Sequence, residues 1–117
     1  MLVALRIALY VQFLLGLGRF FGMVTNPRVW EGHMSLGALI VVLALLALRP
    51  HPKVGEDPIR NVARFAPVIV LLTGAFILSG VVPSRGFVVF HMILGLITVG
   101  LVERSAACQR RALTSAA

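Results

Sequence analysis

Long apolar stretches separated by short polar segments run along the whole chain. Four of them can be read from the sequence: Leu2–Met23, Val29–Leu48, Val62–Val82 and Phe87–Val102. A helix needs about 20 mostly apolar residues to cross a hydrocarbon core of about 30 Å. A helix also satisfies its own backbone hydrogen bonds, as lipid requires. The pattern therefore predicts an all-α integral membrane protein, a single transmembrane domain (residues 1–117) built as a four-helix bundle.

Composition and charge support a membrane protein. The 117 residues are 59% hydrophobic and 13% charged, whereas soluble domains are about 25% charged. The formal net charge of +7 could indicate a nucleic-acid partner. We reject that interpretation because the basic residues cluster at the ends of the predicted helices rather than along one soluble face, which is typical of topology signals.

The basic residues divide unequally between the two sides of the predicted bundle. Three fall on one side, namely Arg19, Arg28 and Arg85. Eight fall on the other, namely Arg6, Arg49, Lys53, Arg60, Arg64, Arg104, Arg110 and Arg111. Because cytoplasmic loops carry the excess of Lys and Arg, we predict cytoplasmic termini and a cytoplasmic 49–61 connection. The predicted location is the cell (inner) membrane.

The chain aligns with itself without a gap when it is shifted by 58 residues. The matching pairs include Arg6 with Arg64, Gly16 with Gly74, Gly22 with Gly80, His33 with His91, Met34 with Met92 and Gly37 with Gly95. Aliphatic matches are common in apolar sequences, but paired glycines and histidines are not. We therefore predict two tandem helical hairpins, 1–58 and 59–117. Two helices return the chain to its starting side, so a pseudo-twofold axis along the membrane normal should relate the copies.

The repeat places one motif, His-Met-x-Leu-Gly, at His33–Gly37 and at His91–Gly95. Each histidine lies about five residues inside the outer end of a helix, or about 8 Å below the boundary. In a sequential bundle their two helices form a diagonal of roughly 12–14 Å. Imidazoles facing across that diagonal leave room for one flat metal macrocycle, and histidine is a common iron ligand. We predict His33 and His91 as the axial ligands of one haem b per chain.

Glycines on the other two helices lie at a similar depth. Gly16 and Gly74 sit about seven and eight residues from the outer ends of their helices, where glycine is locally costly. We predict that they clear space for the macrocycle. Gly37 and Gly95 follow the histidines by four residues and therefore share their helix face. An alternative interpretation is that these glycines only allow close helix packing.

The outer arginines are candidate partners for the two haem propionates. Arg19 and Arg85 are the preferred candidates, and Arg28 follows closely behind them. The alternative is that all three only anchor the helices at the membrane boundary. A carboxylate in the bilayer core and the motifs of covalent haem attachment, phosphate loops and zinc proteases are missing from the sequence. We therefore expect an electron-transfer protein or subunit rather than an autonomous enzyme.

With its paired His-Met-x-Leu-Gly helices, the core over residues 2–102 resembles the small b-type membrane cytochromes. These are four-helix haem bundles such as cytochrome b561-like proteins and related cytochrome b subunits. The resemblance implies a bis-histidine haem b and electron transfer with quinone or a partner protein. Cytochrome b561 proteins usually carry two histidine pairs, one on each membrane side, whereas this chain has one pair.

Two other hypotheses remain open on the sequence alone. The chain could be a cofactor-free structural or assembly subunit of a larger membrane complex, since little of it lies outside the predicted helices. Its histidines could instead bind chlorophyll or another metal, with one histidine for each pigment. In every case we expect the lipid bilayer and further membrane subunits, or a second copy of the chain, as partners.

Overall fold

The regular secondary structure of the described residues is α-helical throughout. The computed structural model describes residues 1–52, 54, 57–81 and 84–115. Its helices are α1 (Leu2–Phe20), α2 (Pro27–Ala47), α3 (Pro58–Leu78) and α4 (Arg85–Ser115). All four are long and apolar enough to cross a membrane. The predicted all-α fold with four apolar helices is thus confirmed, and the chain is a multi-pass membrane protein.

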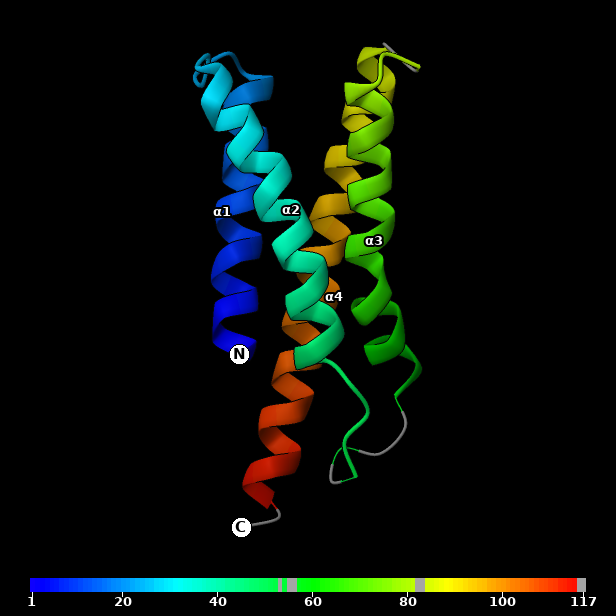
Figure 1. Ribbon diagram of the computed structural model, residues 1–117. Helices are drawn as coiled ribbons and strands as arrows, with labels where there is room; N and C mark the ends of the chain where they lie inside the picture. The colour runs from blue at the N-terminus through cyan, green and yellow to red at the C-terminus, as the bar shows by residue number, and fades with distance from the viewer. Residues whose placement is uncertain (53, 55–56, 82–83, 116–117) are drawn as a thin grey trace.

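The helices follow one another as antiparallel neighbours (Figure 1). Within the described part of the chain, each helix packs against the next and α1 also packs against α4, but α2 and α4 make no close contact. These two helices therefore lie on a diagonal of the bundle, as the sequence predicts. The N-terminus, the α2–α3 connection and the C-terminal part of α4 all lie at one end of the bundle (Figure 1). The two hairpin turns lie at the other.

Side-chain caps set the starts of the second and third helices. The Asn26 side chain accepts a hydrogen bond from the backbone N–H of Arg28 at 3.0 Å. Asp57 accepts in the same way from Ile59 at 3.0 Å. A proline follows each cap, where its missing N–H is harmless. The third helix therefore begins at Pro58, four residues before the predicted start at residue 62, because the cap and not the hydropathy sets the boundary.

Glycines in a left-handed conformation follow the ends of the first and third helices. Gly22 and Gly80 both have φ of +72°, a region that glycine adopts without strain. The helices end two residues earlier, at Phe20 and Leu78. The predicted ends, at residues 23 and 82, were too late because apolar residues continue past the turn; residues 82 and 83 themselves lie outside the described residues.

Alanine at either turn glycine should destabilise the fold through the backbone alone. An added Cβ at Gly22 or Gly80 meets no atom within 4 Å, but the positive φ is unfavourable for any L-residue, by about 1 kcal/mol. We expect Gly22→Ala and Gly80→Ala to lower the free energy of unfolding about equally. Thermal unfolding in detergent, followed by circular dichroism, measures this. Gly32→Ala is the control, and an equal loss there would contradict the explanation.

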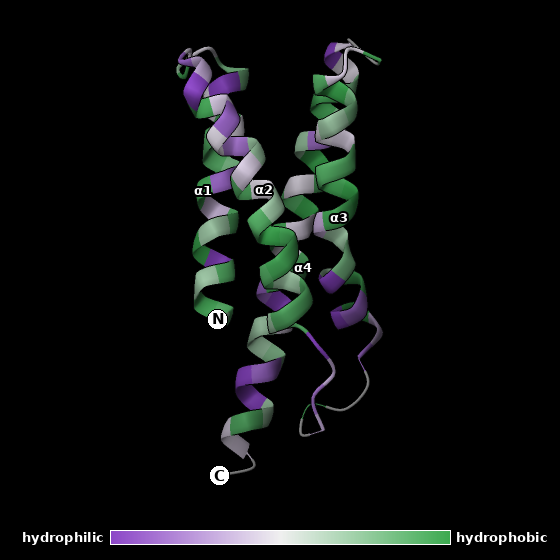
Figure 2. Cartoon of the chain, viewed as in Figure 1, coloured by the Kyte–Doolittle hydropathy of each residue, from purple (hydrophilic) through white to green (hydrophobic). Residues whose placement is uncertain are grey.

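The fourth helix continues well beyond its apolar part. Its predicted end was Val102, but it runs to Ser115. Hydropathy marks only the segment that suits lipid, whereas helical hydrogen bonding continues through the polar residues that follow. Figure 2 shows hydrophobic residues along the middle of the bundle and hydrophilic ones in the C-terminal part of α4. The predicted 29–48 and the observed Pro27–Ala47 for α2 agree within two residues.

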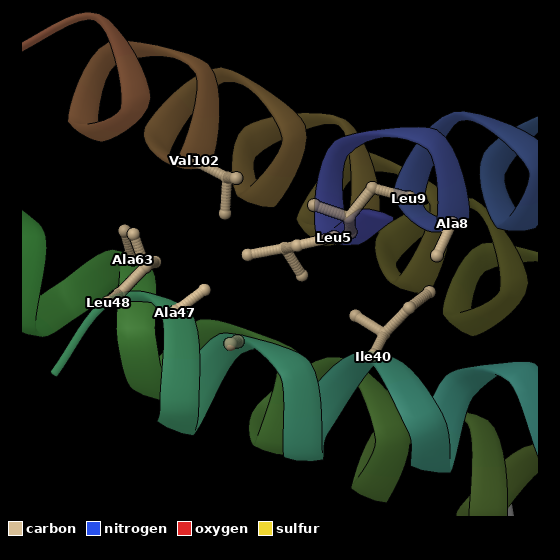
Figure 3. Close-up of a cluster of buried hydrophobic side chains, with 9 residues drawn as sticks. Leu5, Ala8, Leu9, Ile40, Ala47, Leu48, Ala63 and Val102 are labelled. Atoms are coloured by element: carbon tan, nitrogen blue, oxygen red, sulfur yellow. The ribbon is translucent and has the colours of Figure 1, made fainter. Parts of the chain in front are cut away.

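The tightest packing lies toward the end of the bundle that holds the chain termini. Every helix contributes a side chain with no exposed surface: Leu5, Ala44, Ala63 and Val102. Figure 3 shows how most of this cluster converges between the helices. Its small alanines let the helix backbones approach closely. From this cluster the α1–α2 and α3–α4 hairpins diverge toward their turns (Figure 1).

Two arginines 58 residues apart make equivalent contacts between the hairpins. Arg6 Nε donates to Glu103 Oε1 at 2.6 Å and joins α1 to α4. Arg64 Nε donates to the backbone oxygen of Leu45 at 3.2 Å and joins α3 to α2. Leu45 and Glu103 are also 58 residues apart. In both contacts, the arginine and its partner thus occupy the same two positions of the 58-residue repeat, and each contact joins one half of the chain to the other.

The Arg6–Glu103 ion pair should contribute modestly to stability. Each side chain keeps 27% of its surface exposed, and exposed pairs are screened. We expect Arg6→Ala and Glu103→Ala each to lower the unfolding temperature by only a few degrees. The double variant should lose little more than either single one, since both remove the same interaction. Fully additive losses in detergent would show that the two side chains act independently.

Candidate functional site

A pocket lies between the two hairpins and is lined by residues of all four helices. It contains about 790 Å³ of space free of protein atoms, part of which opens to the surface. The cavity volume to compare with other binding sites is about 80 Å³, which is below the roughly 300–1,000 Å³ of small-molecule and cofactor sites. Its lining includes the six residues predicted from the sequence to face a macrocycle: Gly16, His33, Gly37, Gly74, His91 and Gly95. The fold thus brings both histidines and all four glycines to one place.

Each histidine ring lies on a glycine of the other helix in its own hairpin. A Cβ added at Gly16 would lie 3.2 Å from Cε1 of His33, and one added at Gly74 would lie 3.1 Å from Cε1 of His91. These distances are shorter than ordinary carbon–carbon contact. The first use of Gly16 and Gly74 is therefore to seat an imidazole. This differs from the predicted direct clearance for a macrocycle, although both uses need the same missing side chain.

The other two glycines face the opposite hairpin. A Cβ added at Gly37 would lie 3.3 Å from Cδ1 of Leu71 and 3.2 Å from Nε2 of Gln12. One added at Gly95 would lie 3.9 Å from Cδ2 of Phe13. Leu71 and Phe13 are 58 residues apart. Gly37 and Gly95 therefore occupy equivalent places, on the histidine-bearing helices and at the boundary between the hairpins.

The two imidazoles have different polar surroundings. Nδ1 of His91 lies 2.8 Å from Oγ1 of Thr73. Nδ1 of His33 is buried and has no hydrogen-bond partner among the described residues. The Trp30 ring stacks on the His33 ring instead, with centroids 5.3 Å apart and planes inclined by 7°. His33 is 7% exposed, and His91 is partly buried. One ring is therefore oriented by a hydrogen bond and the other by stacking.

The three outer arginines do not line the pocket. Nη1 of Arg19 donates to the backbone oxygen of Val24 at 3.3 Å. Arg28 lies in the first turn of α2, and Arg85 is the first residue of α4. All three thus belong to the end of the bundle that holds the hairpin turns. Their predicted contact with propionates stays a prediction.

Sequence reasoning misses three residues at this site. Gln12 lines the pocket, and its Oε1 is buried without a partner among the described residues. It precedes Gly16 by four residues, so a search for polar residues on the glycine face would have found it. Trp30 also lines the pocket and precedes His33 by three residues, a spacing at which helical side chains meet. The contact of Thr73 depends on side-chain orientation and leaves no comparable signal.

The donor set of this pocket is a pair of imidazoles. Within residues 1–52, 54, 57–81 and 84–115, no group of three or more His, Cys, Asp or Glu side chains is placed to hold a metal ion. Iron inside a macrocycle takes its axial ligands from the protein, and histidine is a common one. No protein-family model, curated protein or solved structure matches this chain.

Proposed function

We propose that this protein is a membrane b-type cytochrome with one haem b per chain. His33 and His91 are its axial ligands. The observation that carries the proposal is that two histidines 58 residues apart, on diagonal helices, line one pocket. Gly16 and Gly74 make the recesses in which the imidazoles are seated. The pocket wall is mostly apolar, as the macrocycle of a haem requires.

The same proposal includes two copies of one helical hairpin related by a pseudo-twofold axis. In its support, α1 and α3 end 58 residues apart, at Phe20 and Leu78. Gly22 and Gly80 share the same positive φ. The glycine–histidine contact occurs once in each hairpin, and the contacts between the hairpins also come in pairs. An axis of this kind passes between the histidines, where the iron is proposed to lie.

We place both termini and the α2–α3 connection in the cytoplasm of a cell (inner) membrane. The support is the excess of basic residues that the sequence assigns to that side of the bundle, eight against three. The haem then lies toward the outer face. A haem supplies reversible one-electron chemistry, and quinone or a partner protein is the proposed donor or acceptor. The apolar surface that the helices expose suits lipid and further membrane subunits.

This chain's residues hold the redox group and set its surroundings. Two imidazoles from opposite corners of the bundle, those of His33 and His91, would hold the haem between the hairpins. Aliphatic, aromatic and methionine side chains from all four helices exclude water from its faces. Burial, together with hydrogen bonds to the axial ligands, sets the reduction potential of such a site. The protein is therefore proposed to act as an electron carrier rather than an enzyme with its own substrate.

Titration with haem tests the proposal. The purified protein in mild detergent is expected to bind haem to saturation at one molecule per chain. Two pigments per chain would contradict a shared bis-histidine site and would instead fit chlorophyll or a similar group with one histidine each. No saturable binding would contradict the cytochrome. The ratio of haem to protein, from absorbance and amino-acid analysis, gives the answer.

One observation favours a second candidate, a cofactor-free structural subunit of a membrane complex. The His33–Gly16 and His91–Gly74 contacts pack each hairpin without any ligand. In that case, histidine variants should change unfolding temperature but no absorption band. If the protein is a cytochrome, the histidine variants should lose their absorption bands, and this loss should be larger than any change in unfolding temperature.

A further inference from the structure

We infer that Thr73 is a positioning residue that holds His91 with its hydrogen on Nδ1 and so presents Nε2 to the iron. The inference rests on the proposed haem site. Thr73 is not part of the pocket lining. It lies on α3, and its hydroxyl oxygen is 2.8 Å from Nδ1 of His91, the ring nitrogen that the proposal leaves free of the metal.

The hydrogen-bond geometry assigns the tautomer of His91. Oγ1 of Thr73 lies 2.8 Å from the backbone oxygen of Val70 and 2.8 Å from Nδ1 of His91. A hydroxyl group has one hydrogen, and a carbonyl oxygen can only accept. With that hydrogen on Val70, the Thr73 oxygen accepts from the Nδ1–H of His91. The neutral ring then carries its lone pair on Nε2, the nitrogen that a metal needs.

Among the described residues, His33 has no equivalent hydrogen bond. The position 58 residues before Thr73 is Leu15, which has no polar atom in its side chain. Nδ1 of His33 is correspondingly buried and has no partner among the described residues. A hydrogen bond to the outer nitrogen makes a metal-bound histidine a stronger donor. The two axial ligands are therefore unequal, and His91 is the stronger one.

Replacement of Thr73 tests the role directly. Thr73→Val keeps the shape and removes the hydroxyl, so haem affinity should fall about 10–100-fold. Thr73→Ser keeps the hydroxyl and should restore most of that affinity. Thr114→Val is the matched control, because the Thr114 hydroxyl also donates to a backbone oxygen of its own helix, that of Arg110 at 2.9 Å, and Thr114 does not line the pocket. Its affinity should equal that of the original protein.

The equivalent position allows the opposite experiment. Leu15→Thr should give Nδ1 of His33 the acceptor that His91 already has. A stronger axial donor stabilises the ferric state, so this variant should have a lower reduction potential than the original protein, and Thr73→Val a higher one. Potentiometric titration in detergent measures both. Shifts of the same sign in the two variants would contradict the inference.

Nitrogen NMR of ¹⁵N-histidine-labelled protein without haem separates this inference from the proposed function. The original protein should show one ring with its hydrogen fixed on Nδ1, and His91→Gln should remove that signal. Thr73→Val should convert it to a mixture of tautomers, whereas Thr114→Val should not. If the original protein binds no haem, the proposed function fails while the NMR result still decides the role of Thr73. Unchanged tautomers and unchanged haem affinity in Thr73→Val would overturn the inference. If Thr73→Val does not fold, unchanged tautomers in Leu15→Thr would overturn it.

Discussion

Alanine at either His33 or His91 is expected to abolish the bis-imidazole haem spectrum. Each residue supplies one of the two axial ligands, so a single replacement leaves the iron with one open position. The loss in haem affinity should exceed the roughly 100-fold that marks the upper range for residues behind the ligands. Absorption spectra and haem titration of the two variants measure it. His91→Ala should lose more affinity than His33→Ala, because the Thr73 hydroxyl oxygen beside Nδ1 makes His91 the stronger donor.

His51→Ala is the matched control for these variants. His51 lies in the α2–α3 connection and does not line the pocket. Its replacement should leave the spectrum and the affinity unchanged. Circular dichroism separates loss of ligand from loss of fold, since the four helices are expected to persist in all three variants. A haem spectrum that survives both His33→Ala and His91→Ala would remove these residues as ligands.

Leucine at Gly16 or Gly74 is the second change with a large expected effect. Even a single Cβ would lie 3.2 Å and 3.1 Å from the imidazoles of His33 and His91, so the larger side chain must displace the ring. We expect Gly16→Leu and Gly74→Leu to lose haem binding while keeping their helical content. Alanine should give an intermediate loss, because the imidazole needs to move by only a few tenths of an ångström.

Gly100→Leu provides the control for size and hydrophobicity. Gly100 is an exposed residue of α4, and an added Cβ there meets no atom within 4 Å. Haem titration of the leucine and alanine series should show losses at Gly16 and Gly74 only. If all three leucine variants bind haem like the original protein, the recesses for the imidazoles have no functional role. If all three lose it, the effect is a general one on the membrane fold.

Much of the fold follows from the sequence because lipid imposes a strong constraint. Hydropathy alone predicts four helices, and a sequential up-and-down order of these helices predicts that the two histidine-bearing ones are diagonal. The helix boundaries do not follow in the same way. Local chemistry sets them, through the Asp57 cap and the left-handed Gly22 and Gly80. The polar end of α4 stays helical because its backbone hydrogen bonds do not depend on apolar side chains.

Some residues of the candidate site could be predicted from the sequence, and others could not. The paired His33 and His91 and the four glycines could be selected from the sequence, because the repeat removes most chance matches. The contacts of Thr73 with His91 and of Trp30 with His33 could not. They depend on side-chain rotamers and on the angle between packed helices, which a pattern of residue types does not specify. The contact of Arg19 with the Val24 backbone oxygen could not be predicted either, since the position of a residue on a helix does not fix the path of a long flexible side chain.

The most direct test of the haem site is the absorption spectrum of the purified protein in mild detergent, first oxidised and then reduced with dithionite. We expect the sharp bands of a low-spin b-type haem with two histidine ligands, at one haem per chain. A protein that stays colourless after haem is supplied, or whose haem is high-spin with a single ligand, would contradict a haem held between His33 and His91.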